Sequence, residues 1–283
     1  MQGTRGGGKE GVDTGQFYQH RDLYDKCQSC RSCLDKGYLL MPFEERRLPL
    51  PWQGTAGPQV KVLFLFAKPS FTKFSPRLSD YSSPPALRAM LDRHYETHAI
   101  AFKRRRSVDG SFRAHARRIA SLLLETPEGT ISDFDDYLFT SLIRCNGQKM
   151  PDLKSQGLIA SECLGLYGAA LLNRLPNLQW IVLVGNISHR LLSLSGVWVK
   201  FQNAFRVCNA PNDLRLPPLV GGVSEVVSLN DRLRLIAVPH FSRGIFRAEH
   251  YRRIFASWMT RPPLPGGGTR PVLSGAPRAA VPH

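Results

Sequence analysis

Four short, almost uninterrupted apolar runs recur along the chain, and they restrict its fold more than any other feature. They cover residues 60–67 (VKVLFLFA), 137–145 (YLFTSLIRC), 180–185 (WIVLVG) and 233–239 (LRLIAVP). A strand that is buried on both faces of a sheet has this composition, because neither side of it is polar. Each run is too short to span a bilayer. The runs therefore predict core strands, and we expect no membrane partner.

Segments with helical spacing lie between these runs. We expect helices over residues 86–94, 153–175 and 250–259, and a further helix that begins at Ser188. Strands that alternate with helices form a parallel sheet that is covered by helices on both faces. The sequence thus predicts an α/β fold, a three-layer α/β/α sandwich with a mostly parallel, four-stranded central sheet. Ligands bind at the carboxyl ends of the strands in such sheets, so we expect site residues just after the runs.

The composition changes along the chain in a way that predicts one folded domain between two tails. Residues 1–16 are rich in glycine and polar residues and predict a flexible arm. Residues 261–283 are rich in proline and glycine and predict a disordered tail. The domain covers residues 17–260, and residues 101–118 look like a basic insertion within it. The run Lys103–Arg106 (KRRR) predicts a phosphate contact or a solvated charged surface.

The charge of the chain points to a polyanionic partner. The 283 residues include 38 Lys and Arg against 22 Asp and Glu, which gives a formal net charge of +16. We expect DNA as the partner, although a basic protein without a nucleic-acid function has the same composition. The start of the sequence does not resemble an apolar secretory segment, so the six cysteines predict reduced thiols or metal ligands. We expect a monomer in the cytoplasm, associated with the nucleoid if the source is bacterial.

Five of the cysteines predict a metal site with four thiolate ligands. Cys27, Cys30 and Cys33 stand three residues apart, and Cys145 and Cys163 follow far along the chain. Four of these five thiolates can hold a [4Fe–4S] cluster, and the same ligands suit a structural zinc ion. Cys145 and Cys163 are the clearer ligands, whereas the sequence does not settle which N-terminal cysteine is not a ligand. In either case we expect the metal to be structural.

The cysteines and the strand ends carry short motifs in a set order. These are CxxCxxC at residues 27–33, FAKPS at 66–70, TSLIRC at 140–145, EC at 162–163, LVG at 183–185 and PHFS at 239–242. In this order they resemble the motifs of the uracil-DNA glycosylase superfamily, particularly its iron–sulfur branches, families 4 and 5. The resemblance covers about residues 20–258. It implies a DNA N-glycosylase of base excision repair, which is a hydrolase.

The resemblance implies that His240 is catalytic. Cleavage of the bond between base and sugar leaves negative charge on the departing base, and a histidine at a strand end can stabilise that charge at a carbonyl oxygen. Where the family has a carboxylate that orients water, this chain has Ala67, followed by Lys68. Family 5 also lacks the acid, so we expect the backbone of residues 67–70 to position the water. Lys68 predicts a phosphate contact or, alternatively, an amine nucleophile.

The residues that would read the base depart from the family pattern. Ser141 stands where the family has an Asn that makes two hydrogen bonds to uracil, and one hydroxyl cannot replace both. Asn146 follows closely as a substitute, and Pro69 and Ser70 keep the turn of the family. An aromatic side chain to stack on the flipped base is available in Phe71, Phe74 or Tyr81. The resemblance therefore leaves the base open between uracil and another deaminated base.

The segment SRGIFR, directly after the histidine motif, resembles the DNA-inserting loop of the family. The resemblance implies that Ile245 or Phe246 wedges into the duplex and holds the target nucleotide out of the stack. Ser242, Arg243 and Arg247 would then contact phosphates. The alternative interpretation is a solvated basic turn.

Two other classes of function fit the same residues. A superfamily member that has lost the acid and the base-reading Asn would be a DNA-binding module, and Ala67 and Ser141 favour this alternative. Substitution of His240 distinguishes the two, because it should abolish the activity of a glycosylase and leave the DNA affinity of a binding module nearly unchanged. The third class is an unrelated zinc-bearing nucleic-acid protein, which would lack the visible absorbance of an iron–sulfur centre.

Overall fold

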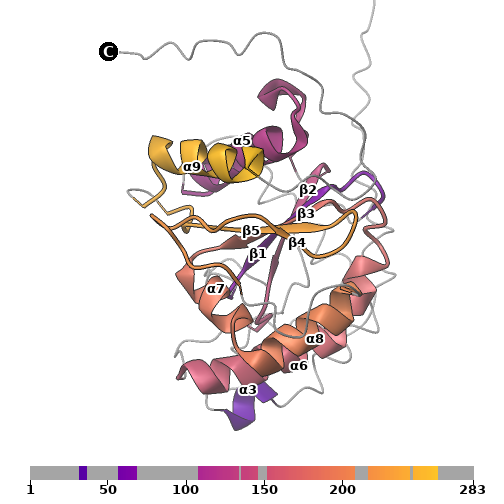
Figure 1. Cartoon of the computed structure of the whole chain (residues 1–283). Coiled ribbons are helices and arrows are strands. Elements are labelled where there is room, and N and C mark those ends of the chain that lie inside the picture. Colours follow the sequence, from indigo (N-terminus) through magenta and orange to yellow (C-terminus); the bar gives the residue numbers. More distant parts are fainter. Residues whose placement is uncertain are drawn as a thin grey trace, which may run out of the picture.

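The computed structural model describes residues 32–36, 57–68, 108–133, 135–145, 152–207, 216–242 and 245–260. The centre of this part of the chain is a five-stranded sheet with helices on both faces (Figure 1). The α/β class and the three layers are therefore confirmed. The predicted arm (1–16), the predicted tail (261–283) and the predicted helix over residues 86–94 lie outside the described residues.

Four strands run parallel and correspond to the four apolar runs. They are β1 (Val62–Phe66), β2 (Tyr137–Ser141), β3 (Trp180–Val184) and β5 (Arg234–Val238). The order in the sheet is β2-β1-β3-β5-β4, and β4 (Val227–Ser228) pairs antiparallel with β5 at the edge. The predicted number of four strands is thus one short. A strand of two residues, one buried and one exposed, leaves no apolar run in the sequence.

The register of the parallel strands brings their carboxyl ends to one level. Phe66 pairs with Ser141 on one side and with Val184 on the other, and Val184 pairs with Val238. Successive side chains of a strand point to opposite faces of the sheet. Those of β1 accordingly enter two separate apolar clusters, one under each helical layer.

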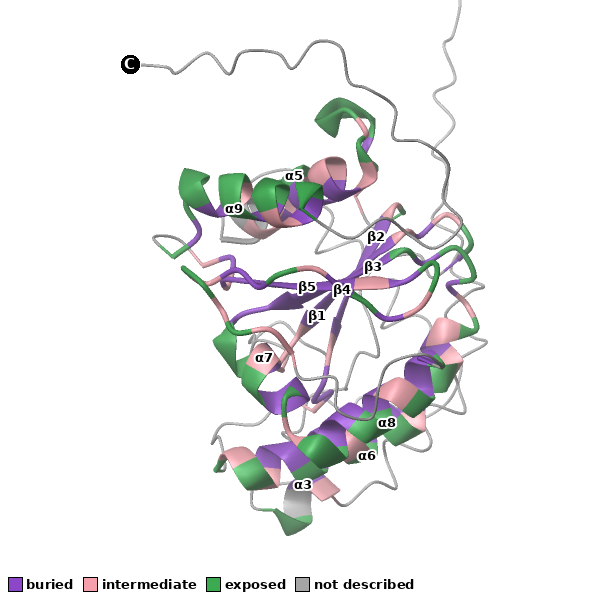
Figure 2. Cartoon of the chain, in the orientation of Figure 1, coloured by how far each residue is buried: buried purple, intermediate pink, exposed green. Residues whose placement is uncertain are grey.

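Each face of the sheet has its own set of helices (Figure 1). One face is covered by α5 (Val108–Leu124) and α9 (Ala248–Met259), and the 3₁₀ turn η3 (Glu128–Thr130) follows α5. The other face is covered by α3 (Ser32–Asp35), α6 (Leu153–Leu172), α7 (Asn186–Leu192) and α8 (Ser195–Phe205). Figure 2 shows buried strands and helices whose outer sides are exposed. None of the described helices is long and apolar enough to cross a membrane.

Some helix boundaries differ from the predicted ones. α6 ends at Leu172 rather than at residue 175, and α9 begins at Ala248 rather than at residue 250. The helix predicted from Ser188 is two helices, α7 and α8, with residues 193–194 between them.

Residues 108–118 of the predicted basic insertion belong instead to α5, one of the two helices that cover one face of the sheet. The buried side of α5 consists of Ala116, Ile119, Ala120 and Leu123. These residues stand at helical spacing, but the arginines between them give the segment the composition of a surface insertion. Residues 101–107, with the run Lys103–Arg106, lie outside the described residues.

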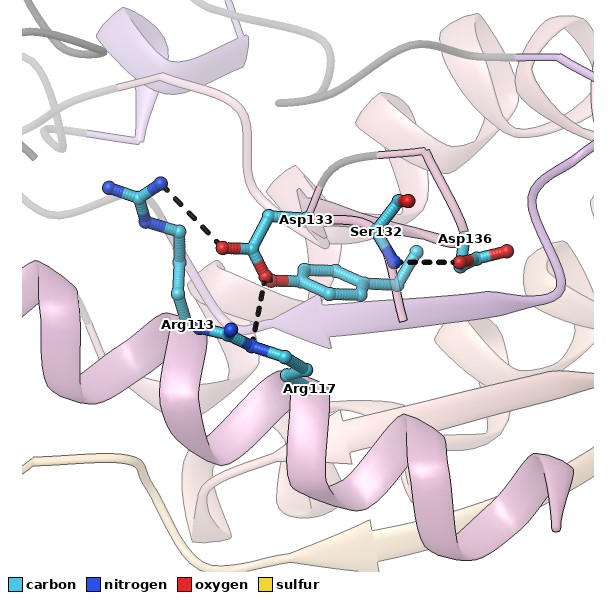
Figure 3. A network of polar contacts seen from close by, with 6 residues as sticks. Arg113, Arg117, Ser132, Asp133 and Asp136 are labelled. Atoms are coloured by element: carbon cyan, nitrogen blue, oxygen red, sulfur yellow. Dashed lines mark hydrogen bonds and ion pairs between the residues drawn. The ribbon is translucent and has the colours of Figure 1, made fainter. Parts of the chain in front are cut away.

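Asp133 ties α5 to the start of β2 (Figure 3). Its carboxylate lies 3.8 Å from Nη1 of Arg113 and 3.4 Å from Nε of Arg117. The Tyr137 hydroxyl donates to Oδ1 of Asp133 at 2.7 Å. Burial raises the pKa of Tyr137, and the charge of Asp133 raises it further, so the hydroxyl stays a donor. In the same turn, the backbone N–H of Ser132 donates to Oδ2 of Asp136 at 2.8 Å.

We expect the substitution Asp133→Ala to lower the free energy of unfolding by about 1–2 kcal/mol, because the Tyr137 hydroxyl loses its acceptor. Urea unfolding followed by circular dichroism measures the change. Asp135→Ala is the matched control, since Asp135 is an exposed acid in the same turn. Equal destabilisation by the two substitutions would contradict a role for Asp133 in holding α5.

Candidate active site

The carboxyl ends of β1, β2, β3 and β5 form one edge of the sheet, and several predicted site residues meet there. Ala67 and Lys68 follow β1, Ser141 ends β2, and His240 lies two residues after β5. Hydrogen bonds continue past the strands: Leu142 N donates to the Phe66 carbonyl at 2.8 Å, and Ile143 N to that of Ala67 at 2.9 Å. The pairing of β1 with β2 therefore continues into the loops that follow them.

Gly185 lets His240 reach across the sheet edge. Its φ of 90° is left-handed, and a Cβ at this position would lie 3.4 Å from the His240 Cβ. The end of β3 thus presents only backbone beneath the imidazole. The His240 ring extends over it as far as Phe66 at the end of β1, where the two ring centroids are 6.0 Å apart.

Aromatic rings surround the half-buried imidazole of His240. Besides Phe66, Phe112 of α5 lies with its centroid 5.3 Å from the imidazole, and both meet it edge-to-face. Burial lowers the pKa of His240, because charging a ring in apolar surroundings is unfavourable. The ring is therefore neutral near pH 7, with one N–H donor and one acceptor nitrogen.

Phe66 and Phe112 are the site residues that sequence reasoning missed. The two half-buried rings lie nearly parallel, with centroids 6.1 Å apart. The three predicted candidates for stacking, Phe71, Phe74 and Tyr81, lie outside the described residues. The sequence signal for Phe66 is its place as the last residue of a buried run, directly before the FAKPS turn. Phe112 carries no comparable signal, because it stands in the segment predicted as an insertion.

The two predicted wedge residues in the loop after β5 differ in their exposure to solvent. Phe246 is only 7% exposed and packs against Phe241, His115 and Tyr251, with centroids 5.5, 4.7 and 4.9 Å away. It is a core residue rather than a wedge, because this aromatic cluster removes it from solvent. Ile245 is 52% exposed and remains the candidate wedge.

The polar residues of this loop lie next to the N-terminus of α9. Ser242 is half-buried, and its carbonyl accepts from Ile245 N at 3.2 Å. Arg247 is exposed at the N-cap of α9, where its backbone N–H donates to Nδ1 of His250 at 2.7 Å. Arg247 therefore stands within the same short loop as Ile245. Arg243, together with Pro69, Ser70 and Asn146, lies outside the described residues.

The described cysteines lie on the opposite face of the sheet from the aromatic rings. Cys33 on α3 and Cys163 on α6 are buried in one apolar cluster, and Cys145 packs against it. Contacts between α3 and α6 bring the start of the described chain onto α6. Cys27 and Cys30 lie outside the described residues. Within the described part of the chain, no three His, Cys, Asp or Glu residues form a group that would hold a metal ion.

Arg144 is a buried cation beside these cysteines, and sequence reasoning did not single it out. Its side chain is 3% exposed, Nη1 donates to Oγ1 of Thr140, and the guanidinium lies over the Tyr167 ring, 5.3 Å from the centroid. Burial lowers the pKa of Arg144 to about 10, an effect that Cys163 partly offsets. The group therefore stays charged at neutral pH. The sequence signal for Arg144 is its place as a basic residue inside the apolar run YLFTSLIRC.

Comparisons with known proteins assign no family to the chain. No protein-family model matches the sequence, and no curated protein matches it significantly.

We expect the free energy of unfolding to fall as the pH drops below about 6.5. Burial lowers the pKa of His115, His240 and His250 below the ordinary 6.5, so the unfolded chain binds protons that the folded chain does not. The histidine contribution is complete above pH 6.5 and is lost as the pH falls through the folded pKa values. Urea unfolding between about pH 8 and pH 5 measures the loss. A flat profile, or one that rises toward acid, would contradict it, and His240→Gln should flatten it in part.

Proposed function

We propose that the protein is a DNA glycosylase of base excision repair, which flips uracil or another deaminated base and hydrolyses its N-glycosidic bond. The observation that carries the proposal is the position of His240 at the carboxyl edge of the sheet, against Phe66 and Phe112. Ligands bind at this edge in parallel α/β sheets. A neutral imidazole beside aromatic rings suits a flat, uncharged heterocycle with a carbonyl group.

His240 supplies the chemistry of bond cleavage in this proposal. When the bond between base and sugar breaks, the bonding electrons leave with the base, and positive charge develops on the sugar. The His240 N–H donates to the carbonyl oxygen on which the negative charge collects, and a neutral donor needs no proton transfer to do so. Water adds to the sugar carbon and gives up a proton, and the departing base takes up a proton from solvent.

The other residues of the edge hold the base and the water. Phe66 and Phe112 stack on the flipped base, and a base–aromatic contact of this kind contributes about 1–3 kcal/mol. Ser141, level with Phe66 in the sheet, makes one hydrogen bond to the base. The backbone of Ala67 positions the water, since no carboxylate stands there. Asn146 and the turn at residues 69–71 complete the proposed contacts.

DNA binding rests on the net charge of +16 and on the loop after β5. Ile245, which is exposed, enters the base stack. Lys68, Ser242, Arg243 and Arg247 contact phosphates on either side of it. We take the active form to be a monomer in the cytoplasm.

A four-thiolate metal site completes the proposal as a structural element. Cys145, Cys163 and two of Cys27, Cys30 and Cys33 would hold a [4Fe–4S] cluster or, alternatively, zinc. The charged Arg144 guanidinium beside Cys163 supports an anionic group of this kind. The metal would supply no step of the reaction; its thiolates would join the N-terminal cysteine segment to α6 and to the segment after β2.

The second candidate function is a DNA-binding module without glycosylase activity. Ala67 and Ser141 favour it, because neither can do what the carboxylate and the Asn of the family do. The two functions differ in what they require of His240, which a binder does not need.

We expect His240→Ala to reduce base release by about 10²- to 10³-fold, because the leaving base loses its hydrogen-bond donor. DNA affinity should change by no more than about threefold, since the phosphate contacts remain. The assay measures free base released from oligonucleotides that contain uracil, hypoxanthine or xanthine. His189→Ala is the control, because the His189 Nε2 contacts the Pro217 carbonyl and α7 packs on the opposite face of the sheet from Phe66 and Phe112. If the intact protein binds these oligonucleotides and releases no base, it is a binding module.

A further inference from the structure

Arg144 is a positive charge inside the protein that pairs with no carboxylate in the described part of the chain, and its one electrostatic neighbour there is the Cys163 sulfur. Its side chain is 3% exposed. None of the ion pairs among the described residues includes it. A buried cation is unfavourable unless an anion or a full set of hydrogen bonds compensates for the lost water. The surroundings of Arg144 should therefore contain a negative group.

The described neighbours of Arg144 do not supply that charge. Thr140 contributes a hydroxyl and Tyr167 the face of its ring, and burial raises the pKa of Tyr167, so both are neutral. The Nε of Arg144 is buried and has no hydrogen-bond partner among the described residues. The guanidinium thus has a free donor as well as an unbalanced charge.

The anion must lie on the cysteine side of the sheet. Tyr167 and Cys163 stand one turn apart on α6, and both are buried, so the guanidinium lies on the helix face that carries Cys163. Cys145 is the next residue along the chain from Arg144. A DNA phosphate does not fit, because it would have to reach a side chain that is almost fully buried. Four thiolates around Zn²⁺ or a [4Fe–4S]²⁺ core leave a net charge of about −2, which does fit.

We infer that Arg144 is the cationic partner of a metal–thiolate site that includes Cys163 and Cys145, and that it neutralises this site within the core. The inference rests on the metal site of the proposed function and not on base release. Arg144 is a positioning and charge-balancing residue, not a catalytic one. Its removal should weaken metal retention, and for an iron–sulfur cluster it should make the reduction potential more negative.

The test compares the intact chain with Arg144→Met, Arg144→Lys and the control Arg190→Met, which changes an exposed arginine of α7. Iron, sulfide and zinc are measured per chain after anaerobic purification, and then the rate of metal loss to a chelator. We expect Arg144→Met to lose metal about tenfold faster or more, Arg144→Lys to lie between, and Arg190→Met to match the unchanged chain. Equal rates for Arg144→Met and the unchanged chain would overturn the inference, as would an unchanged chain without metal, whatever the result for base release.

Thermal stability with and without metal provides a second measurement, and its metal-free half does not depend on how well the variant binds metal. In the metal-free protein Arg144 has no anion, so Arg144→Met should melt at the same temperature as the unchanged chain or higher. In the metal-loaded protein the unchanged chain should be the more stable. A variant that is equally destabilised in both forms would show a packing role alone and overturn the inference.

Discussion

The in-register pairing of β1 with both β2 and β3 is the constraint on which the rest of the structure depends. Phe66 is level with Ser141 and Val184, so the strands end together and their loops form one edge. The loop backbones extend this pairing beyond Phe66. A slip of one residue in β1 would exchange the two faces of the strand and turn Phe66 away from His240.

Because side chains alternate along the strands, the two faces of the sheet carry different sets of residues. Phe66 faces α5 and α9, where Phe112, Phe241 and the His240 ring gather. The next residue packs against the other cluster, which also contains Cys33 and Cys163. The proposed base site and the proposed metal site thus lie in separate layers. A substitution in one of these proposed sites therefore does not directly touch the residues of the other.

The sequence predicts those parts of the fold that rest on composition. Buried parallel strands need continuous apolar runs, so the sequence predicts all four of them. β4 has too few residues to form such a run. Residues 108–118 were misassigned because the arginines of α5 hide its apolar side. The position of His240 followed from a motif at a strand end. The rings around it, the burial of Phe246 and the isolation of Arg144 depend on contacts between segments far apart in the chain, which spacing alone does not reveal.

The central claim is that a base binds at His240, and imidazole NMR tests it most directly. Protein with ¹⁵N-labelled histidine is titrated with an oligonucleotide that carries 2′-fluoro-deoxyuridine, which resists cleavage because fluorine disfavours positive charge on the sugar. His240→Gln identifies the signal, and an oligonucleotide with thymine is the comparison. We expect a neutral His240 ring whose N–H signal shifts when the uracil oligonucleotide binds and shifts less when the thymine oligonucleotide binds. A His240 signal that stays in place while the DNA is bound would contradict it.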